Sequence, residues 1–577
     1  MSSLITPIDI ASTLPFIVLC LFGMVVLLLE VFQRQGQSRS YLAYVSAVGF
    51  ATAAFSAWLL MGVEGQLVFH DMNYIDGFSK VTALLMCTAG AVTCLIAPRY
   101  LAELNADRGE FYALILFSAG GMIMMVSAAD FIVFFMALEL MSIAVYALAA
   151  YVRSSRVAAE AGFKYFLMGA FASAIMLYGI ALVYGATGTT NLAAIGQLLS
   201  YGAASGSVDP ALLLSKVSEQ GALAGAAGYD TTTGDLLMLN YGSGTANMPL
   251  LYLGITLVIV SAVFKVGAVP FHMWLPDAYS GAPSPVGAFM ASAVKAAAFA
   301  SLLRLLALAF FDYELRMGPM GWVQVTFFLA LLSMAIGNLV AIAQTSVKRM
   351  LAYSSIAHTG YMLVAITAMG YGVGDLDLGA SVVFYLFAYV FGTVGAFGIL
   401  AYLTRSRYYV ERFSDLNGLG YRYPALGVAM TLFMLSSAGI PPTAGFIAKF
   451  QVFKAAVIAY GAGVEAGEPG ALLLLALVVS GILFSVVGVY YYLKVIVHLY
   501  MRDPVREVTA SDSGPARVGI SVCAIATLVI GLFPGPLLNL SEQAMSQMEG
   551  RHDGVYVQYE DGAPIEDLQR LMREGSR

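Results

Sequence analysis

Runs of about 20 apolar residues recur along almost the whole chain, and they limit the possible fold more than any other feature. Each run is long enough to cross a hydrocarbon core roughly 30 Å thick. Only 11% of the residues are charged, against roughly 25% in a typical soluble domain. A water-soluble protein could not bury so much apolar surface. The sequence therefore predicts an all-α, polytopic membrane protein.

About fourteen transmembrane helices are expected. The first apolar run has no basic region before it, so we interpret it as a membrane helix and not as a cleaved signal peptide. The seventh run meets Pro270, and the twelfth contains Pro441 and Pro442. Proline removes a backbone donor and clashes with the preceding turn, so we expect helices 7 and 12 to be broken. The runs lie near 11–32, 41–62, 77–98, 111–127, 130–151, 162–185, 249–270, 284–309, 322–344, 350–370, 379–403, 424–459, 471–499 and 517–536.

The basic residues indicate the orientation, because lysine and arginine are enriched in short cytoplasmic loops. With the N-terminus outside, the even-numbered loops clearly hold only Lys216 and Arg316. We therefore expect both termini on the positive, periplasmic side of the membrane. The odd-numbered loops hold Arg34, Arg39, Arg99, Arg108, Arg153, Arg156, Lys348, Arg349, Arg405, Arg407, Arg412, Arg422, Arg502, Arg506 and Arg517.

Two segments are predicted to lie outside the membrane. Residues 186–248 are rich in Gly, Ala, Ser and Thr, which is typical of a long external loop. Residues 541–577 form a polar tail that could include a short amphipathic helix. The broken helices 7 and 12 stand five spans apart, so two five-helix repeats would have inverted topology, and transport sites form at interrupted helices in such folds. We divide the chain into N-terminal helices 1–3 (1–110), a first repeat (111–309), a second repeat (322–499), a last helix (500–540) and the tail (541–577).

Four ionisable side chains fall inside predicted helices: Glu139, Lys265, Lys295 and Lys449. Each would cost roughly 2.5–3.5 kcal/mol at a helix centre if it had no partner. A buried lysine releases its proton more readily than one in water, and a nearby carboxylate opposes that release. These residues therefore suit stepwise proton transfer. His358 is a plausible intermediate because histidine titrates near neutral pH.

Structural alternatives exist for these residues. Glu139 and Lys265 could form a static ion pair, and His358 could be an interior histidine that is simply hydrogen-bonded. Lys454 lies deeper in its helix, and no role is assigned to it. The four cysteines form no CxxC pair, which disfavours metal and Fe–S sites, and no basic run suggests nucleic acid. Snorkelling to the membrane surface would explain the basic residues near helix ends, namely Lys80, Lys164, Arg304 and Lys494.

Four motifs resemble those of the antiporter-like subunits of respiratory complex I, and they are closest to the bacterial N type. The longest runs from Phe264 to Pro285 (FKVGAVPFHMWLPDAYSGAPSP), and the second from Asn338 to His358 (NLVAIAQTSVKRMLAYSSIAH). The others are ELMS, which begins at Glu139, and AGIPPTAGFIAKF, which contains Lys449. The SGAPSP sequence and a lysine at position 449 favour the N type over the M type. The L type carries a long C-terminal lateral helix that is not expected here. The resemblance covers about residues 8–535.

The resemblance implies a fourteen-helix fold with one proton path. It implies Glu139 and Lys265 as the coupling pair, Lys295 as the central relay, and Lys449 toward the exit. It implies no cofactor in this chain, with NADH, FMN, Fe–S clusters and quinone belonging to partner subunits. M-type and K-type membrane subunits are the expected neighbours, in a bacterial inner membrane. The loop at 186–248 and the tail after 537 are longer than the resemblance implies.

Three functional settings share this proton path. The first is a membrane subunit of a proton-pumping NADH–quinone oxidoreductase. The second is a subunit of a multi-protein sodium/proton antiporter. The third is a subunit of a proton-pumping hydrogenase, or of a plastoquinone- or deazaflavin-linked dehydrogenase. The N-type motifs favour the first setting, although the chemistry of the residues fits all three.

Overall fold

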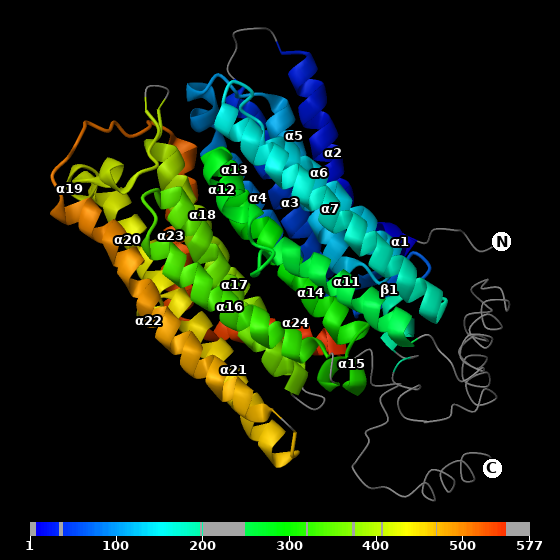
Figure 1. Ribbon diagram of the computed structural model, residues 1–577. Coiled ribbons are helices and arrows are strands. Elements are labelled where there is room, and N and C mark those ends of the chain that lie inside the picture. The colour runs from blue at the N-terminus through cyan, green and yellow to red at the C-terminus, as the bar shows by residue number, and fades with distance from the viewer. Residues whose placement is uncertain are drawn as a thin grey trace, which may run out of the picture.

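The computed structural model shows a bundle of tilted helices (Figure 1). It describes residues 7–33, 39–196, 199, 248–318, 321–371, 376–405, 408–468 and 470–549. Within that part, thirteen helices are long and apolar enough to cross a membrane. Most of the predicted external loop, from 200 to 247, and the tail beyond 549 lie outside the described residues.

The described residues up to Leu308 form the elements from α1 to α14. They are α1 (Pro7–Ser12), α2 (Leu14–Val31), α3 (Ser40–Leu59), η1 (Leu60–Gly62), β1 (Gln66–Val68), β2 (Asn73–Ile75), α4 (Gly77–Glu103), α5 (Gly109–Ser127), α6 (Phe131–Ala149), α7 (Arg156–Thr187), α11 (Met248–Val266), α12 (Trp274–Gly281), α13 (Ser284–Phe289), η2 (Met290–Val294) and α14 (Lys295–Leu308).

The second half continues with further long helices and short connections. They are α15 (Tyr313–Met317), α16 (Trp322–Ile342), α17 (Val347–Tyr371), η3 (Leu376–Gly379), α18 (Ala380–Leu403), η4 (Phe413–Leu416), α19 (Leu419–Arg422), α20 (Pro424–Ala438), α21 (Ala444–Glu465), α22 (Ala471–Met501), α23 (Gly514–Leu532) and α24 (Gly535–Glu549).

Each of the fourteen predicted apolar runs contains a helix, and the two predicted breaks are present. Helix α11 ends at Val266, and α12 starts at Trp274 after the turn that holds Pro270. The twelfth run is split into α20 and α21 around Pro441 and Pro442. The prolines explain both breaks, because neither ring fits the hydrogen-bonded interior of a helix. The tenth run forms α17, which is the most polar of the long helices and is not among the thirteen apolar ones.

The helix that carries Lys295 lies at the centre of the bundle. The most apolar window of Ser284–Leu308 is buried over its whole length, and that of Ala380–Leu403 over 89% of its length. In contrast, only 28% of the corresponding windows of α2 and α22 is buried. Those outer helices present apolar faces of the kind that lipid or a neighbouring subunit covers.

Two elements differ from the expected fold. A small antiparallel hairpin pairs β1 with β2, with Gln66 opposite Ile75, so the described part is not helical throughout. The predicted polar tail begins with an ordered helix, α24, which reaches Glu549 and buries Ala544, Met545 and Met548. Helix α24 therefore crosses the predicted boundary at 540, and the spacing of its apolar residues lets one face pack against α4 and α18.

Candidate functional site

Lys295 is held at an irregular turn in the centre of the bundle. The π-helical segment η2 ends at Val294, directly before it, and such turns redirect side chains at many functional sites. The ammonium group donates to the carbonyl and to the hydroxyl oxygen of Ser355, at 2.5 Å each. It also lies 5.5 Å from the centre of the Tyr389 ring. Only 2% of Lys295 is exposed.

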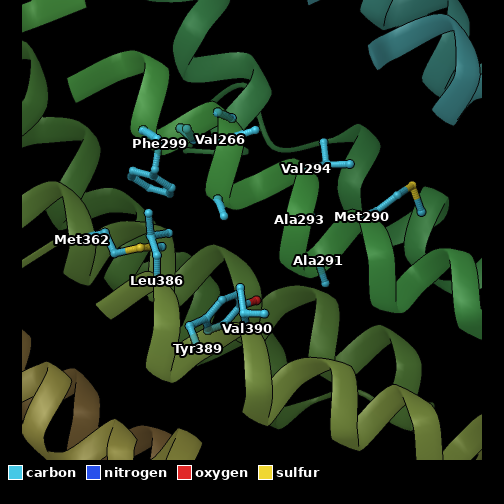
Figure 2. Close-up of a cluster of buried hydrophobic side chains, with 14 of the residues drawn as sticks. Val266, Met290, Ala291, Ala293, Val294, Phe299, Met362, Leu386, Tyr389 and Val390 are labelled. Carbon is cyan, nitrogen blue, oxygen red and sulfur yellow. The ribbon is translucent and has the colours of Figure 1, made fainter. Parts of the chain in front are cut away.

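Apolar side chains from several helices form one buried cluster with Val294, the residue directly before Lys295. Figure 2 shows Val266 from α11, Phe299 from α14, Met362 from α17, and Leu386 with Tyr389 from α18. All of them are buried. The two Ser355 oxygens hold the lysine at a defined position.

Lys265 lies at the end of α11, one residue before the break. Its ammonium group donates to the Ser142 hydroxyl at 2.7 Å and to the Tyr146 hydroxyl at 3.1 Å, both on α6. The ring of Tyr146 lies 5.3 Å from the same nitrogen. Lys265 is 5% exposed, so α6 supplies the polar contacts that allow its charge inside the bundle.

Glu139 lies on α6 one turn before Ser142, and it is half-buried. Its carboxylate accepts a short hydrogen bond from the Ser173 hydroxyl on α7. No ion pair within 4.0 Å joins Glu139 to Lys265, although both residues are described. The static ion pair considered from the sequence is therefore not formed. Glu139 lies on α6, and Lys265, from α11, donates to the hydroxyl groups of Ser142 and Tyr146 on that same helix.

Thr359 on α17 bridges the surroundings of Lys265 and Lys295. Its hydroxyl donates to the carbonyl of Val266, at 2.9 Å, and to the carbonyl of Ser355, at 3.2 Å. Val266 is the last residue of α11, and Ser355 holds Lys295. The break in helix 7 thus frees a carbonyl that α17 uses to connect the two lysine sites.

His358 is buried between two tyrosines from different helices. Its Nδ1 lies 2.6 Å from the Tyr385 hydroxyl on α18, and its Nε2 lies 3.0 Å from the Tyr492 hydroxyl on α22. The Tyr492 hydroxyl also bonds to the Ser354 hydroxyl. Both ring nitrogens are satisfied, as a structural histidine requires. The same hydroxyl partners can pass a proton to the ring or take one from it.

Lys449 lies at the break between α20 and α21. Its ammonium group donates to the carbonyls of Ser437 and Ala438, at 3.0 Å each, and to the Ser485 hydroxyl at 2.9 Å. Ser437 and Ala438 are the last two residues of α20. Terminal carbonyls of a helix have no partner within it and carry the negative end of its dipole. The break therefore creates the site that stabilises the cation.

A second polar cluster joins Lys449 to the surroundings of His358. The Lys449 ammonium lies 5.0 Å from the centre of the Tyr361 ring. The amide of Asn338 donates to the Tyr361 hydroxyl at 3.1 Å, and the Tyr491 hydroxyl donates to the amide oxygen at 3.0 Å. None of these three residues was predicted as part of the site. For Tyr361, the clustering of serine, threonine, histidine and tyrosine on α17 was the available signal.

Arg304 is not a snorkelling residue, so the sequence-based interpretation was wrong. It is 1% exposed, and its guanidinium group makes two hydrogen bonds to the Asp76 carboxylate, at 2.8 and 2.9 Å. Asp76 is the N-cap of α4 and is also fully buried. The sequence could not show that these residues face each other across the bundle.

The other basic residues near helix ends have local partners. Lys80 is also buried, and its ammonium group donates to the Val63 carbonyl at 2.6 Å. Lys164 pairs with Glu160 and Asp277 at a more exposed position. Lys494 donates to the carbonyl of Gln344 at 3.1 Å. Within the described residues, no group of three or more His, Cys, Asp or Glu side chains could hold a metal ion.

The chain matches the family described as "NADH:quinone oxidoreductase/Mrp antiporter, TM" over residues 128–464. It is 40% identical to NADH-quinone oxidoreductase subunit N 1 of Sorangium cellulosum, over 92% of this chain and 97% of that one. It is 38% identical to NADH-quinone oxidoreductase subunit N of Myxococcus xanthus, over 93% and 98%.

Solved structures show the same fold. A chain of respiratory complex I from Thermus thermophilus is 31% identical, covers 92% of this chain and 99% of its own length, and superposes with a TM-score of 0.67. A chain of the Mrp complex from Dietzia is 20% identical over 95% and 98%, with a TM-score of 0.72. At that identity the likeness concerns the fold alone. The relatives at 38–40% identity, together with the matching motifs and the broken helices, show that the chain belongs to subunit N of NADH–quinone oxidoreductase, an antiporter-like membrane subunit of respiratory complex I.

Proposed function

We propose that protons cross this subunit along the buried row Glu139, Lys265, Lys295, His358 and Lys449, driven by electron transfer from NADH to quinone in the assembled complex. One observation carries the proposal. Each of the three lysines is at most 6% exposed and is held by neutral oxygens. No carboxylate within the described residues lies within 4.0 Å of any of them. A lysine without a counter-charge can lose its proton at small cost, as a relay requires.

Glu139 would act on Lys265 through its charge. Lys265 donates to the Ser142 and Tyr146 hydroxyls of α6, the helix that carries Glu139. A nearby negative charge favours the protonated form of a lysine, so a gain or loss of the Glu139 charge would change how firmly Lys265 holds its proton. This interaction needs no direct ion pair.

The surroundings of Glu139 suit a contact with a neighbouring subunit. Met136 and Ile143 lie on the same helix and are 64% and 60% exposed. An M-type subunit on one side and a K-type subunit on the other are the proposed neighbours, with the redox centres and quinone site in other subunits. From the distribution of basic residues, both termini face the positive side of a bacterial inner membrane.

The proposal is tested with Lys265→Met and Lys449→Met in the complete complex. Methionine keeps the length and apolar bulk of lysine but carries no proton. The measurement is proton uptake into inverted membrane vesicles after NADH addition, with the amount of assembled complex determined in parallel. Both variants should assemble and lose the protons carried by this subunit.

Lys494→Met is the matched control. This lysine also lies in a membrane helix but bonds to the Gln344 carbonyl and packs over the Phe413 ring, away from the row. The control should pump normally. Normal pumping by Lys265→Met and Lys449→Met would contradict the proposed row.

A further inference from the structure

Helix α18 carries a second line of polar side chains that the proposed row does not use. Ser381, Tyr385, Tyr389 and Thr393 are spaced four residues apart, and the residues between them are all apolar. Side chains at this spacing lie along one face of a helix. All four are less than 10% exposed. We call these four residues the α18 stripe.

The α18 stripe meets the proton row at two points. The ring of Tyr389 lies 5.5 Å from the Lys295 ammonium. The Tyr385 hydroxyl lies 2.6 Å from Nδ1 of His358. The stripe therefore begins beside the central relay and runs toward the N-terminal end of α18.

At that end the stripe reaches a cavity of about 180 Å³, lined by Ser381, Gln451, Lys454, Ser541 and Glu542 among others. A single water needs roughly 10–15 Å³ in this measure, so several fit. Lys454 and Glu542 are exposed, so the cavity opens at the surface. No ion pair within 4.0 Å joins these two among the described side chains.

The cavity does not lie beside the Lys449 ammonium, and Ser381 is the residue of the α18 stripe that lines it. Lys454 follows Lys449 by five residues on α21, which places it roughly 7.5 Å further along and about 140° around the helix. Lys449 thus faces α20 and α22, whereas the cavity lies between α21, α18 and α24. The Ser381 hydroxyl donates to the carbonyl of Leu378, another lining residue, at 2.7 Å.

Helix α24 covers this cavity. Its Met545 and Gln547 side chains lie so close to Gly379 and Gly77 that a Cβ on either glycine would meet them within 3 Å. Those glycines mark the starts of α18 and α4. Figure 1 shows α24, in red, lying across the bundle. In the proposed orientation these elements lie at the positive side of the membrane.

We propose that the cavity under α24 is a water-filled proton exit, supplied from His358 through Tyr385 and Ser381. The Tyr385 oxygen would accept a proton from His358 and release its own hydrogen toward Ser381 and the cavity water. The Glu542 carboxylate would then take it up at the surface. Only N–H and O–H bonds form and break, and the proton leaves to the positive side. This exit rests on the proposed proton row: a proton that has reached Lys449 would return to His358 and leave from there.

Cysteine labelling tests the cavity directly. Intact cells that carry Glu542→Cys are treated from outside with an impermeant, positively charged thiol reagent, and inverted vesicles are then prepared. Bulk and positive charge in the cavity should reduce NADH-driven proton uptake. Gln543→Cys is the control, because Gln543 is exposed on α24 but does not line the cavity. Its modification should leave pumping unchanged. Full pumping by modified Glu542→Cys would overturn the proposal, and loss of a co-purified phospholipid on labelling would identify a lipid site instead.

The variant Tyr385→Phe distinguishes a refutation of the proposed exit from a refutation of the proposed proton row. It removes the hydroxyl next to His358 and preserves the buried ring. The exit predicts reduced proton uptake at a normal amount of assembled complex. Full pumping by Tyr385→Phe beside impaired pumping by Lys265→Met would overturn the exit and leave the row standing. Full pumping by both would contradict the row itself.

Discussion

Replacing Asp76 with asparagine should destabilise the chain more than replacing its partner Arg304 with methionine. Both side chains are at most 2% exposed, and they make two hydrogen bonds of 2.8 and 2.9 Å. Removing one partner of such a buried pair costs about 3–5 kcal/mol. Arginine does not lose its proton in a protein, so Asp76→Asn leaves a buried cation. Arg304→Met leaves an aspartate that can take up a proton, and its cost should lie toward the lower end of that range.

The substitution Asp76→Asn removes the charge of this side chain but keeps its role as a helix cap. The Asp76 side chain also accepts a hydrogen bond from the Ser79 amide at 2.8 Å. Asparagine is an equally good N-cap residue. The cap, whose loss costs about 1 kcal/mol, is therefore kept in Asp76→Asn. The double variant Asp76→Asn/Arg304→Met removes both charges and should recover most of the stability.

The assay is the midpoint temperature at which the detergent-purified complex loses this chain, together with the amount of complex in membranes. The expected order of stability is wild type, double variant, Arg304→Met, Asp76→Asn. Arg99→Met is the control, because Arg99 is 53% exposed in its pair with Glu103, and exposed pairs contribute only about 0–1 kcal/mol. An Asp76→Asn variant as stable as the wild type, or a double variant less stable than both single ones, would refute the reasoning.

Three further outcomes are expected. Gly439→Ala should weaken pumping, because the new Cβ would lie 2.9 Å from Cδ of Lys449. Gly439 also has φ of +82°, and this left-handed backbone costs an alanine roughly 1–2 kcal/mol. Normal proton uptake would contradict this prediction. Ser355→Ala should reduce pumping less than a methionine at Lys295, because the Ser355 carbonyl still accepts from the lysine; an equal loss would show that the hydroxyl is essential. Burial raises the pKa of the Asp107 carboxyl, in the α4–α5 connection, to about 6, against about 3.9 in an unfolded chain. Its stabilising contribution is therefore complete below pH 4 and is lost as the pH rises through 6. Thermal midpoints between pH 4 and 7 should fall less steeply in Asp107→Asn than in the wild type, and an unchanged slope would exclude this group.

Apolar periodicity and proline placement were sufficient to predict the spans and the breaks. Pro270 and Pro441–Pro442 lie in runs that are otherwise helical, so their local effect on the backbone could be inferred without tertiary information. The buried charges Lys265, Lys295 and Lys449 could also be identified, because charge is rare in an apolar helix. Helix α24 was partly missed, since its apolar face becomes apparent only when α4 and α18 are in place.

Partners distant in sequence could not be predicted. Arg304 and Asp76 are 228 positions apart, and nothing local to either residue indicates the other. The contacts of the Tyr385 and Tyr492 hydroxyls with His358 could not be predicted either. Tyrosine is common in membrane helices, and only the packing of α17 against α18 and α22 brings these two hydroxyls to the histidine. The distance between Glu139 and Lys265 also depended on helix packing, so their charges could be identified but not their direct contacts.

Proton pumping by a Lys295→Arg variant tests the central claim most directly. Arginine keeps the positive charge at the π-helical turn, and it can donate to the same Ser355 oxygens. Its pKa of about 12 or more prevents it from releasing the proton. The measurement is NADH-driven proton uptake into inverted vesicles, normalised to the amount of assembled complex. A proton relay predicts normal assembly with impaired pumping for Lys295→Arg, and poorer assembly together with impaired pumping for Lys295→Met. Full pumping by Lys295→Arg would show that Lys295 supplies only a structural charge and would contradict the proposed relay.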